Sequence, residues 1–171
     1  MQLPLRFSLR YHPLFLELGR HLRQASWGSL QGASLQASLN NKHDKAELVA
    51  FVCYLLGLPS HTHVISQASL TQLVFIYPAY ALQLQMIVAE ELHETSTFWG
   101  SLSFNNSNMV EIRFGHECWI AVSRREDEYY HVPLPEGSAE EYRRLDETQG
   151  FRVLPLELEK QVDAYIQSLS L

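Results

Sequence analysis

Hydrophobic and polar residues alternate along several short stretches of the chain, which is typical of strands with one buried face. The second half shows the pattern most clearly, because a hairpin is predicted on either side of the polar turn at residues 105–108. Two further strands follow, over residues 117–123 and 129–134. Connections this short require antiparallel neighbours, so the pattern predicts a β-meander.

Alternation also appears earlier in the chain. It predicts a strand over residues 2–12, and another over residues 33–39, where a surface loop is the alternative. Residues 82–88 favour a strand over a helix, and residues 61–66 fit a short strand. Between them, residues 70–77 fit a helix by spacing and a strand by propensity, so both alternatives stay open.

Four segments have the spacing and the end signals of helices. Pro13 opens the first, and Asp44 begins a second that is apolar nearly all round and ends at Gly57. Ser138 and Glu141 form a capping box for a short charged helix, and Pro155 starts the last one. A helix that is apolar all round is usually buried on most sides, so the second helix is predicted to lie in the core.

The stretch Leu48–Ala89 supplies the centre of the predicted core, since its 42 residues contain no Asp, Glu, Lys or Arg. A membrane span is not expected here. The unbroken apolar part, Leu48–Leu58, is shorter than the roughly 20 residues that a span needs, and the later part is interrupted by Gln83, Gln85 and Pro78.

These elements predict one α+β domain over residues 1–171. We expect an antiparallel meander of about four to six strands packed against helices, with the C-terminal helix on the sheet.

Charge and cysteine usage narrow the classes of protein. The net charge of −6 argues against nucleic acid as a partner, because phosphate binding needs a concentrated basic surface. Cys53 and Cys118 stand in apolar surroundings and are predicted to be free thiols of a reducing compartment. No signal peptide is visible, so a cytoplasmic location is predicted.

The sequence lacks a Gly-rich phosphate loop, a dinucleotide-binding glycine fingerprint and a nucleophile elbow. Neither a metal nor a cofactor is predicted, although His and Glu residues with ligand-like spacing stand in two places, and whether they converge stays open. His116 and Cys118 have the spacing of a pair on one face of a strand. The ligand-like residues are His61, His63, Glu90, Glu91 and His93.

Aromatic residues on the predicted sheet suggest a protein partner. Trp99, Tyr129 and Tyr130 are the candidate partner-binding residues, because adjacent tyrosines on a strand cannot both point inward. The leading hypothesis is a non-catalytic cytoplasmic protein-binding module, such as an adaptor, chaperone or assembly factor. The alternatives are a small-molecule binder with an apolar cavity between sheet and helix, and an enzyme that uses His, Glu and Cys residues of the second half. Another protein is the expected partner, and a homodimer is one form of it.

Overall fold

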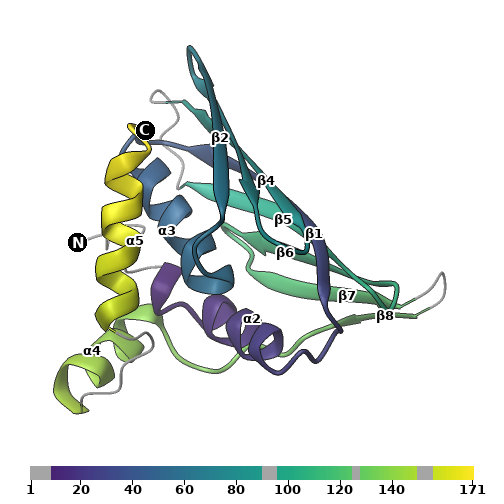
Figure 1. Ribbon diagram of the computed structural model, residues 1–171. Helices are drawn as coiled ribbons and strands as arrows, with labels where there is room; N and C mark the ends of the chain where they lie inside the picture. Colours follow the sequence, from purple (N-terminus) through teal and green to yellow (C-terminus); the bar gives the residue numbers. More distant parts are fainter. Residues whose placement is uncertain (1–8, 90–95, 125–127, 150–155) are drawn as a thin grey trace.

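The computed structural model describes residues 9–89, 96–124, 128–149 and 156–171, and places the helices on one side of a single sheet (Figure 1). The strands lie side by side in the order β2-β3-β4-β1-β5-β6-β7-β8. Their bounds are β1 Leu30–Leu39, β2 His61–Gln67, β3 Leu70–Ile76, β4 Ala81–Val88, β5 Thr97–Phe104, β6 Asn108–Phe114, β7 Trp119–Arg124 and β8 Glu128–His131.

One pair in the middle of the sheet distinguishes it from a simple meander. Among the described strands, β1 and β4 run parallel, and every other neighbouring pair is antiparallel. Parallel neighbours need a crossover connection. The helix α3, Asp44–Leu56, and the hairpin of β2 and β3 provide it, so β1 becomes a central strand.

The helices begin where the sequence signals predict. Pro13 is the first residue of α2, Pro13–Arg23, and the Nδ1 atom of His12 accepts the Leu14 N–H at 3.1 Å. In α4, Ala139–Gln149, the Ser138 and Glu141 side chains bond reciprocally to each other's backbone N–H, which confirms the predicted capping box. The last helix is α5, Leu156–Ser168.

The core lies between the sheet and the helices, and α3 is its middle layer. All of residues 48–54 are buried, because α3 packs against both α2 and α5 and also covers the sheet. The Phe51 ring lies 5.5 Å from Phe15 of α2 and 5.2 Å from Phe98 of β5. The prediction that this apolar helix lies in the core is therefore confirmed.

Polar contacts join the start of the described chain to the last two helices. The Arg10 guanidinium forms an ion pair with Glu159 of α5, and the Tyr11 hydroxyl donates to Oδ2 of Asp146 in α4 at 2.6 Å. Burial, together with this hydrogen bond, raises the pKa of Tyr11 to about 12. These contacts hold α4 and α5 against the N-terminal segment.

The two sides of the sheet differ in what covers them. On β3, β4 and β6, buried residues that face the helices alternate with residues that point away from them. We call the side without helices the open face (Figure 1). In register, its side chains include Gln36 of β1, Gln72 of β3, Gln85 of β4, Trp99 of β5, Glu111 and Arg113 of β6, Trp119 of β7 and Tyr129 of β8.

The α+β class and the mostly antiparallel sheet are confirmed, but the predicted number of strands is too low. Residues 70–76 form β3, because they pair on one side with β2 and on the other with β4. The strand predicted over residues 2–12 is wrong where it is described, since Leu9 and Arg10 are helical. The C-terminal helix packs mainly on α3, and reaches the sheet edge where the Tyr165 and Thr62 hydroxyls bond.

Both cysteines are free, as predicted. Burial raises the pKa of the Cys53 thiol to about 12, so this thiol stays protonated and unreactive. Among the described residues, no helix is long and apolar enough to cross a membrane.

Candidate functional site

Polar side chains gather at one edge of the sheet, where β1 ends and β5 begins. Because β1 and β4 are parallel, their carboxyl ends lie at the same edge, and in α/β sheets this edge is where ligands commonly bind. The chain passes from β1 through Asn40 into α3, whose first residue is Asp44. Ser96 stands directly before β5. Because β5 runs antiparallel to β1, Ser96 lies beside Asn40 and Asp44.

A hydrogen-bonded cluster of Asn40, Asp44 and Ser96 fixes this edge; we call it the edge cluster. The Ser96 Oγ atom lies 2.6 Å from Oδ2 of Asp44 and 2.9 Å from Oδ1 of Asn40, and it accepts the Asn40 N–H at 3.1 Å. Since a hydroxyl has one hydrogen, it donates to one oxygen at a time. Ser96 is only 7% exposed, whereas Asn40 and Asp44 are half-buried.

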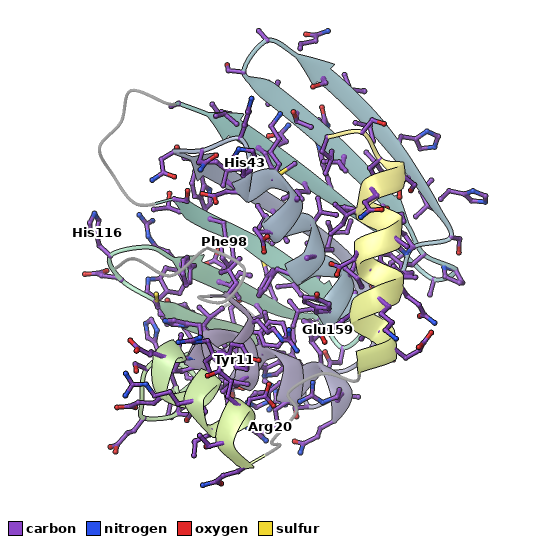
Figure 2. All side chains as sticks on the ribbon, turned by 90° about the vertical axis from the view of Figure 1, so that its left-hand side faces the viewer. Tyr11, Arg20, His43, Phe98, His116 and Glu159 are labelled. Carbon is purple, nitrogen blue, oxygen red and sulfur yellow. The ribbon has the colours of Figure 1, made fainter. Side chains whose placement is uncertain are left out.

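Charged residues surround the edge cluster at the start of α3. His43 stands at the N-cap position of α3 without a side-chain capping bond, and its exposed imidazole lies at the end of the molecule away from Tyr11 and Arg20 (Figure 2). Asp44 stands in the first turn, where the helix dipole stabilises a carboxylate. Lys45 donates from Nζ to the hydroxyl of the buried Thr71 at 2.9 Å, which ties the helix start to β3.

This arrangement can bind a polar organic molecule. A carboxylate accepts hydrogen bonds from hydroxyl groups, and an amide side chain both accepts and donates them. Asp44 and Ser96 could not be predicted as site residues from the sequence, because they are far apart in the chain. The signal in the sequence was a strand that ends in a polar turn and leads directly into a helix.

The predicted partner-binding residues do not share one face. Trp99 and Tyr129 point from β5 and β8 to the open face, whereas Tyr130 is paired with the buried Val122 and points to the other side. A hollow of about 310 Å³ lies on the open face between Trp99 and Trp119. Its floor and rim include Ser34, Gln36, Ser101, Glu111 and Arg113.

The ligand-like residues of the sequence do not form a site in the described part of the chain. His61 and His63 lie exposed on the edge strand β2, and Glu90, Glu91 and His93 lie outside the described residues. No group of three or more His, Cys, Asp or Glu side chains within the described ranges is arranged to hold a metal ion.

The spacing of His116 and Cys118 also gives no reactive pair. The Cys118 thiol donates to the Gly115 carbonyl at 3.6 Å, and His116 points outward from the tip of its turn (Figure 2).

A second hollow lies on the helix side, but not where the apolar cavity was expected. It measures about 330 Å³ and is lined by residues of α2, α3, β1 and β5, among them Leu22, Leu30, Leu55 and Phe104. None of the residues that line it belongs to α5. The cavity predicted between sheet and C-terminal helix therefore stays a prediction.

No family model matches the sequence, and no curated protein matches it either. Solved structures share its fold. A Thermotoga maritima protein to which oxidoreductase activity is ascribed has a TM-score of 0.67 at 14% identity, over 94% of this chain and 58% of its own. For the Bacillus subtilis protein yvaA, also ascribed to the oxidoreductases, the TM-score is 0.66 at 12% identity, over 96% and 60%.

A levoglucosan dehydrogenase in complex with NADH and levoglucosan has a TM-score of 0.58 at 9% identity, over 77% of this chain and 46% of its own. The chain thus spans less than two thirds of the length of each of these proteins. The prediction of a non-catalytic adaptor, chaperone or assembly factor is wrong, since the structures that share this fold are of oxidoreductases and dehydrogenases.

Proposed function

We propose that this chain is the substrate-binding part of an oxidoreductase, and that its substrate is a small organic molecule with several hydroxyl groups. The edge cluster carries the proposal. Asp44 and Asn40 present half-buried oxygen atoms at the carboxyl end of a parallel pair of strands, and Ser96 holds them in place. Levoglucosan, the ligand of one protein with this fold, is a molecule of this class.

The residues of the edge cluster have distinct roles in this proposal. The Asp44 carboxylate accepts a hydrogen bond from a substrate hydroxyl, and the Asn40 side chain bonds to a neighbouring oxygen of the substrate. The His43 imidazole, exposed at the start of α3, accepts the hydroxyl proton of the alcohol, and a nicotinamide cofactor held outside this chain would take the hydride from its carbon. The Ser96 hydroxyl is a positioning group, because it is buried and already bonded within the cluster.

One protein with this fold binds NADH, but the described residues of this chain do not form a site for such a dinucleotide. A dinucleotide's pyrophosphate needs a glycine-rich turn and a free helix N-terminus. The turn after β1 reads Asn40-Asn41-Lys42-His43 without a glycine, and Asp44 places a negative charge in the first turn of α3. The cofactor therefore belongs to a part of the enzyme outside this chain, in line with the chain's partial coverage of its structural neighbours.

Calorimetric titration with levoglucosan, glucose and NADH tests the proposal. We expect saturable binding of at least one of the two sugars, with a Kd of about 1 mM, and no binding of NADH. Asp44→Asn and Ser96→Ala should each weaken sugar binding about fivefold to tenfold, the value of one or two hydrogen bonds. Glu140→Gln, the same kind of change on exposed α4, is the control.

Two results would contradict the proposal. The first is that neither sugar binds, or that a sugar binds equally well to Asp44→Asn, provided that this variant unfolds at the same urea concentration as the native chain. The second is saturable NADH binding, which would place the cofactor site within this chain.

A further inference from the structure

The two outer strands of the sheet, β2 and β8, differ in how their free edges are protected (Figure 1). Edge strands of natural proteins are commonly short or carry charges, prolines or bulges, which prevent further strands from pairing with them. β8 has four residues, among them Glu128, and Pro133 stands two residues after it. β2 has seven residues without Asp, Glu, Lys, Arg or Pro, and its register with β3 is unbroken. The outer edge of β2 is therefore open to a further strand.

The backbone of β2 offers hydrogen-bonding groups on this outer edge. In an antiparallel pair, successive residues alternate between bonding to the partner strand and pointing away from it. The Ser69 carbonyl, directly before β3, accepts the Val88 N–H of β4 at 3.0 Å, so the odd-numbered residues of β3 bond to β4 and the even-numbered ones to β2. By the register of β2 with β3, Thr62, Val64 and Ser66 direct their N–H and C=O groups outward. Among the described residues, no strand other than β3 pairs with β2.

Side chains beside this edge form an apolar surface on the helix side of the sheet. Val64 points to that side and is 39% exposed, although its register partner Leu73 is buried. The helix α5 stands over the same strand, because the Tyr165 and Thr62 hydroxyls bond to each other. Tyr165 and Ile166 of α5 pack against the core and stay half-buried. A partner that suits this edge therefore brings both a strand to pair with β2 and an apolar helix to pack beside α5.

We propose that β2 pairs antiparallel with β2 of a second copy of this chain, about a two-fold axis perpendicular to the sheet at Val64. A second copy supplies both a strand and a helix, since this operation joins the two sheets edge to edge and puts both α5 helices on the same side. It pairs all seven residues of β2, with Thr62 opposite Ser66 and His63 opposite Ile65. The outward N–H and C=O groups of one copy then bond to those of the other, as between strands inside the sheet.

Charge favours a second copy over an acidic or basic segment of another protein. The chain carries −6, but β2 contains no Asp, Glu, Lys or Arg. Two copies therefore bring no like charges together along the paired strands, where like charges directly opposite each other are destabilising. A charged extended segment would find no opposite charge on β2. The strand is thus complementary to itself, as a two-fold interface requires.

The size of the contact predicts a weak dimer. The seven residues of β2 extend over about 23 Å, and a sheet with one layer of helices is roughly 20 Å thick. The contact therefore covers roughly 500 Å² on each copy, at the low end of specific interfaces. We expect a Kd of about 100 µM, so covalent trapping is the suitable test. The inference is independent of the proposed function, because it uses none of the residues of the edge cluster.

Disulfide trapping at about 100 µM chain in a glutathione buffer tests the pairing. Val64→Cys places two thiols opposite each other across the axis, on Cα atoms about 5.5 Å apart, which a disulfide can bridge. Ile65→Cys is the control, because its Cα atoms would lie about 8 Å apart across the same axis, beyond the reach of a disulfide. Both variants also carry Cys118→Ser, so that the buried Cys53 is the remaining native thiol. We expect at least tenfold more linked dimer from Val64→Cys, whereas random collision would favour Ile65, which is 55% exposed.

A proline on the outer edge tests the backbone bonds. Ser66→Pro, added to Val64→Cys, removes an N–H that bonds across the axis, and it should lower the yield of linked dimer at least tenfold. Ser66→Ala, added in the same way, keeps this N–H and should leave the yield unchanged. Urea unfolding of the reduced variants checks their folding, and the comparison of Val64→Cys with Ile65→Cys decides if Ser66→Pro unfolds earlier. Equal yields from these two cysteine variants, or a yield that a folded Ser66→Pro variant leaves unchanged, would overturn the proposal.

Discussion

The two faces of this sheet are built from the same strands but follow different rules. The face toward the helices holds aromatic and aliphatic side chains, such as Phe75, Leu84 and Phe98, with almost no exposed surface. The open face alternates with it residue by residue, yet it carries glutamine, serine and tryptophan in place of the charges that an ordinary solvated face carries. The alternation along a strand therefore shows which residues are buried, while the type of polar residue on the other face indicates the surroundings of that face.

The adjacent residues Phe98 and Trp99 give the strongest test of this difference. The Phe98 ring lies 5.2 Å from both Phe51 and Phe114, so Phe98→Ala should lower the free energy of unfolding by about 3–5 kcal/mol. Trp99→Ala, on the open face, should lower it by less than about 1 kcal/mol when the chain is kept dilute and monomeric. Urea unfolding followed by circular dichroism measures both, and equal losses would contradict the distinction between the faces.

Gly100 tests how closely the buried face is packed. A Cβ atom there would lie 2.3 Å from the Ser34 carbonyl oxygen of the neighbouring strand. Gly100→Ala should therefore cost about 1–3 kcal/mol of unfolding free energy, since β1 and β5 must move apart. Gly57→Ala is the control for a glycine without close neighbours, although its positive φ adds some strain of its own. If Gly100→Ala left the free energy of unfolding unchanged, β1 and β5 would be able to move apart without cost.

His12 makes the helix side sensitive to pH. Burial lowers the pKa of His12 below its ordinary value of 6.5, so the unfolded chain takes up the proton more readily. The contribution of the neutral, buried His12 to the free energy of unfolding is complete above about pH 6.5. It is lost as the pH falls through the lower pKa that His12 has in the folded state. Protonated Nδ1 also cannot accept the Leu14 N–H.

The unfolding free energy measured at pH 7.5 and 5.5 checks this effect. His12→Asn keeps a capping acceptor without a titrating ring, so the free energy of unfolding should fall less between pH 7.5 and pH 5.5 in this variant. His131→Asn, on the open face, is the matched control. If the free energy of unfolding of His12→Asn depended on pH as it does in the native chain, His12 would not be the source of the pH dependence.

The smallest effect is expected at the glutamines of the open face. Gln85→Ala should change the unfolding free energy of the monomer by no more than about 0.5 kcal/mol, because the side chain is not part of the core. A larger loss in dilute solution would mean that the neighbouring glutamines Gln36, Gln85 and Gln72 stabilise the sheet themselves.

Local patterns predicted those parts of the fold that depend on neighbours in the sequence. Alternation found the hairpin of β5 and β6, and apolar composition placed α3 in the core. Residues 70–76 could not be assigned from their own sequence, because the spacing Leu70, Leu73, Val74 suits a helix and the residue types suit a strand. Only pairing with β2 and β4 decides in favour of the strand.

The edge cluster and the parallel pair could not be predicted for the same reason. Asp44 and Ser96 meet because β5 pairs with β1, and Ala81 meets Gly32 because α3 and a hairpin intervene. No local pattern encodes such contacts. The sequence shows the aromatic residues, but the face to which each points, which separates Tyr129 from Tyr130, follows from the register.

The central position of β1 has a consequence for how the chain is made. β1 emerges early in synthesis, but both of its partners, β4 and β5, come after the crossover. At about 5–20 residues per second, Phe104 follows Leu39 by roughly 3–13 s. β1 has two unpaired edges until β4 is made and one until β5 is made, and its non-local contacts should make folding slow compared with a helical protein of this size. Newly made chains are then most vulnerable to aggregation through the strand that later becomes the best protected.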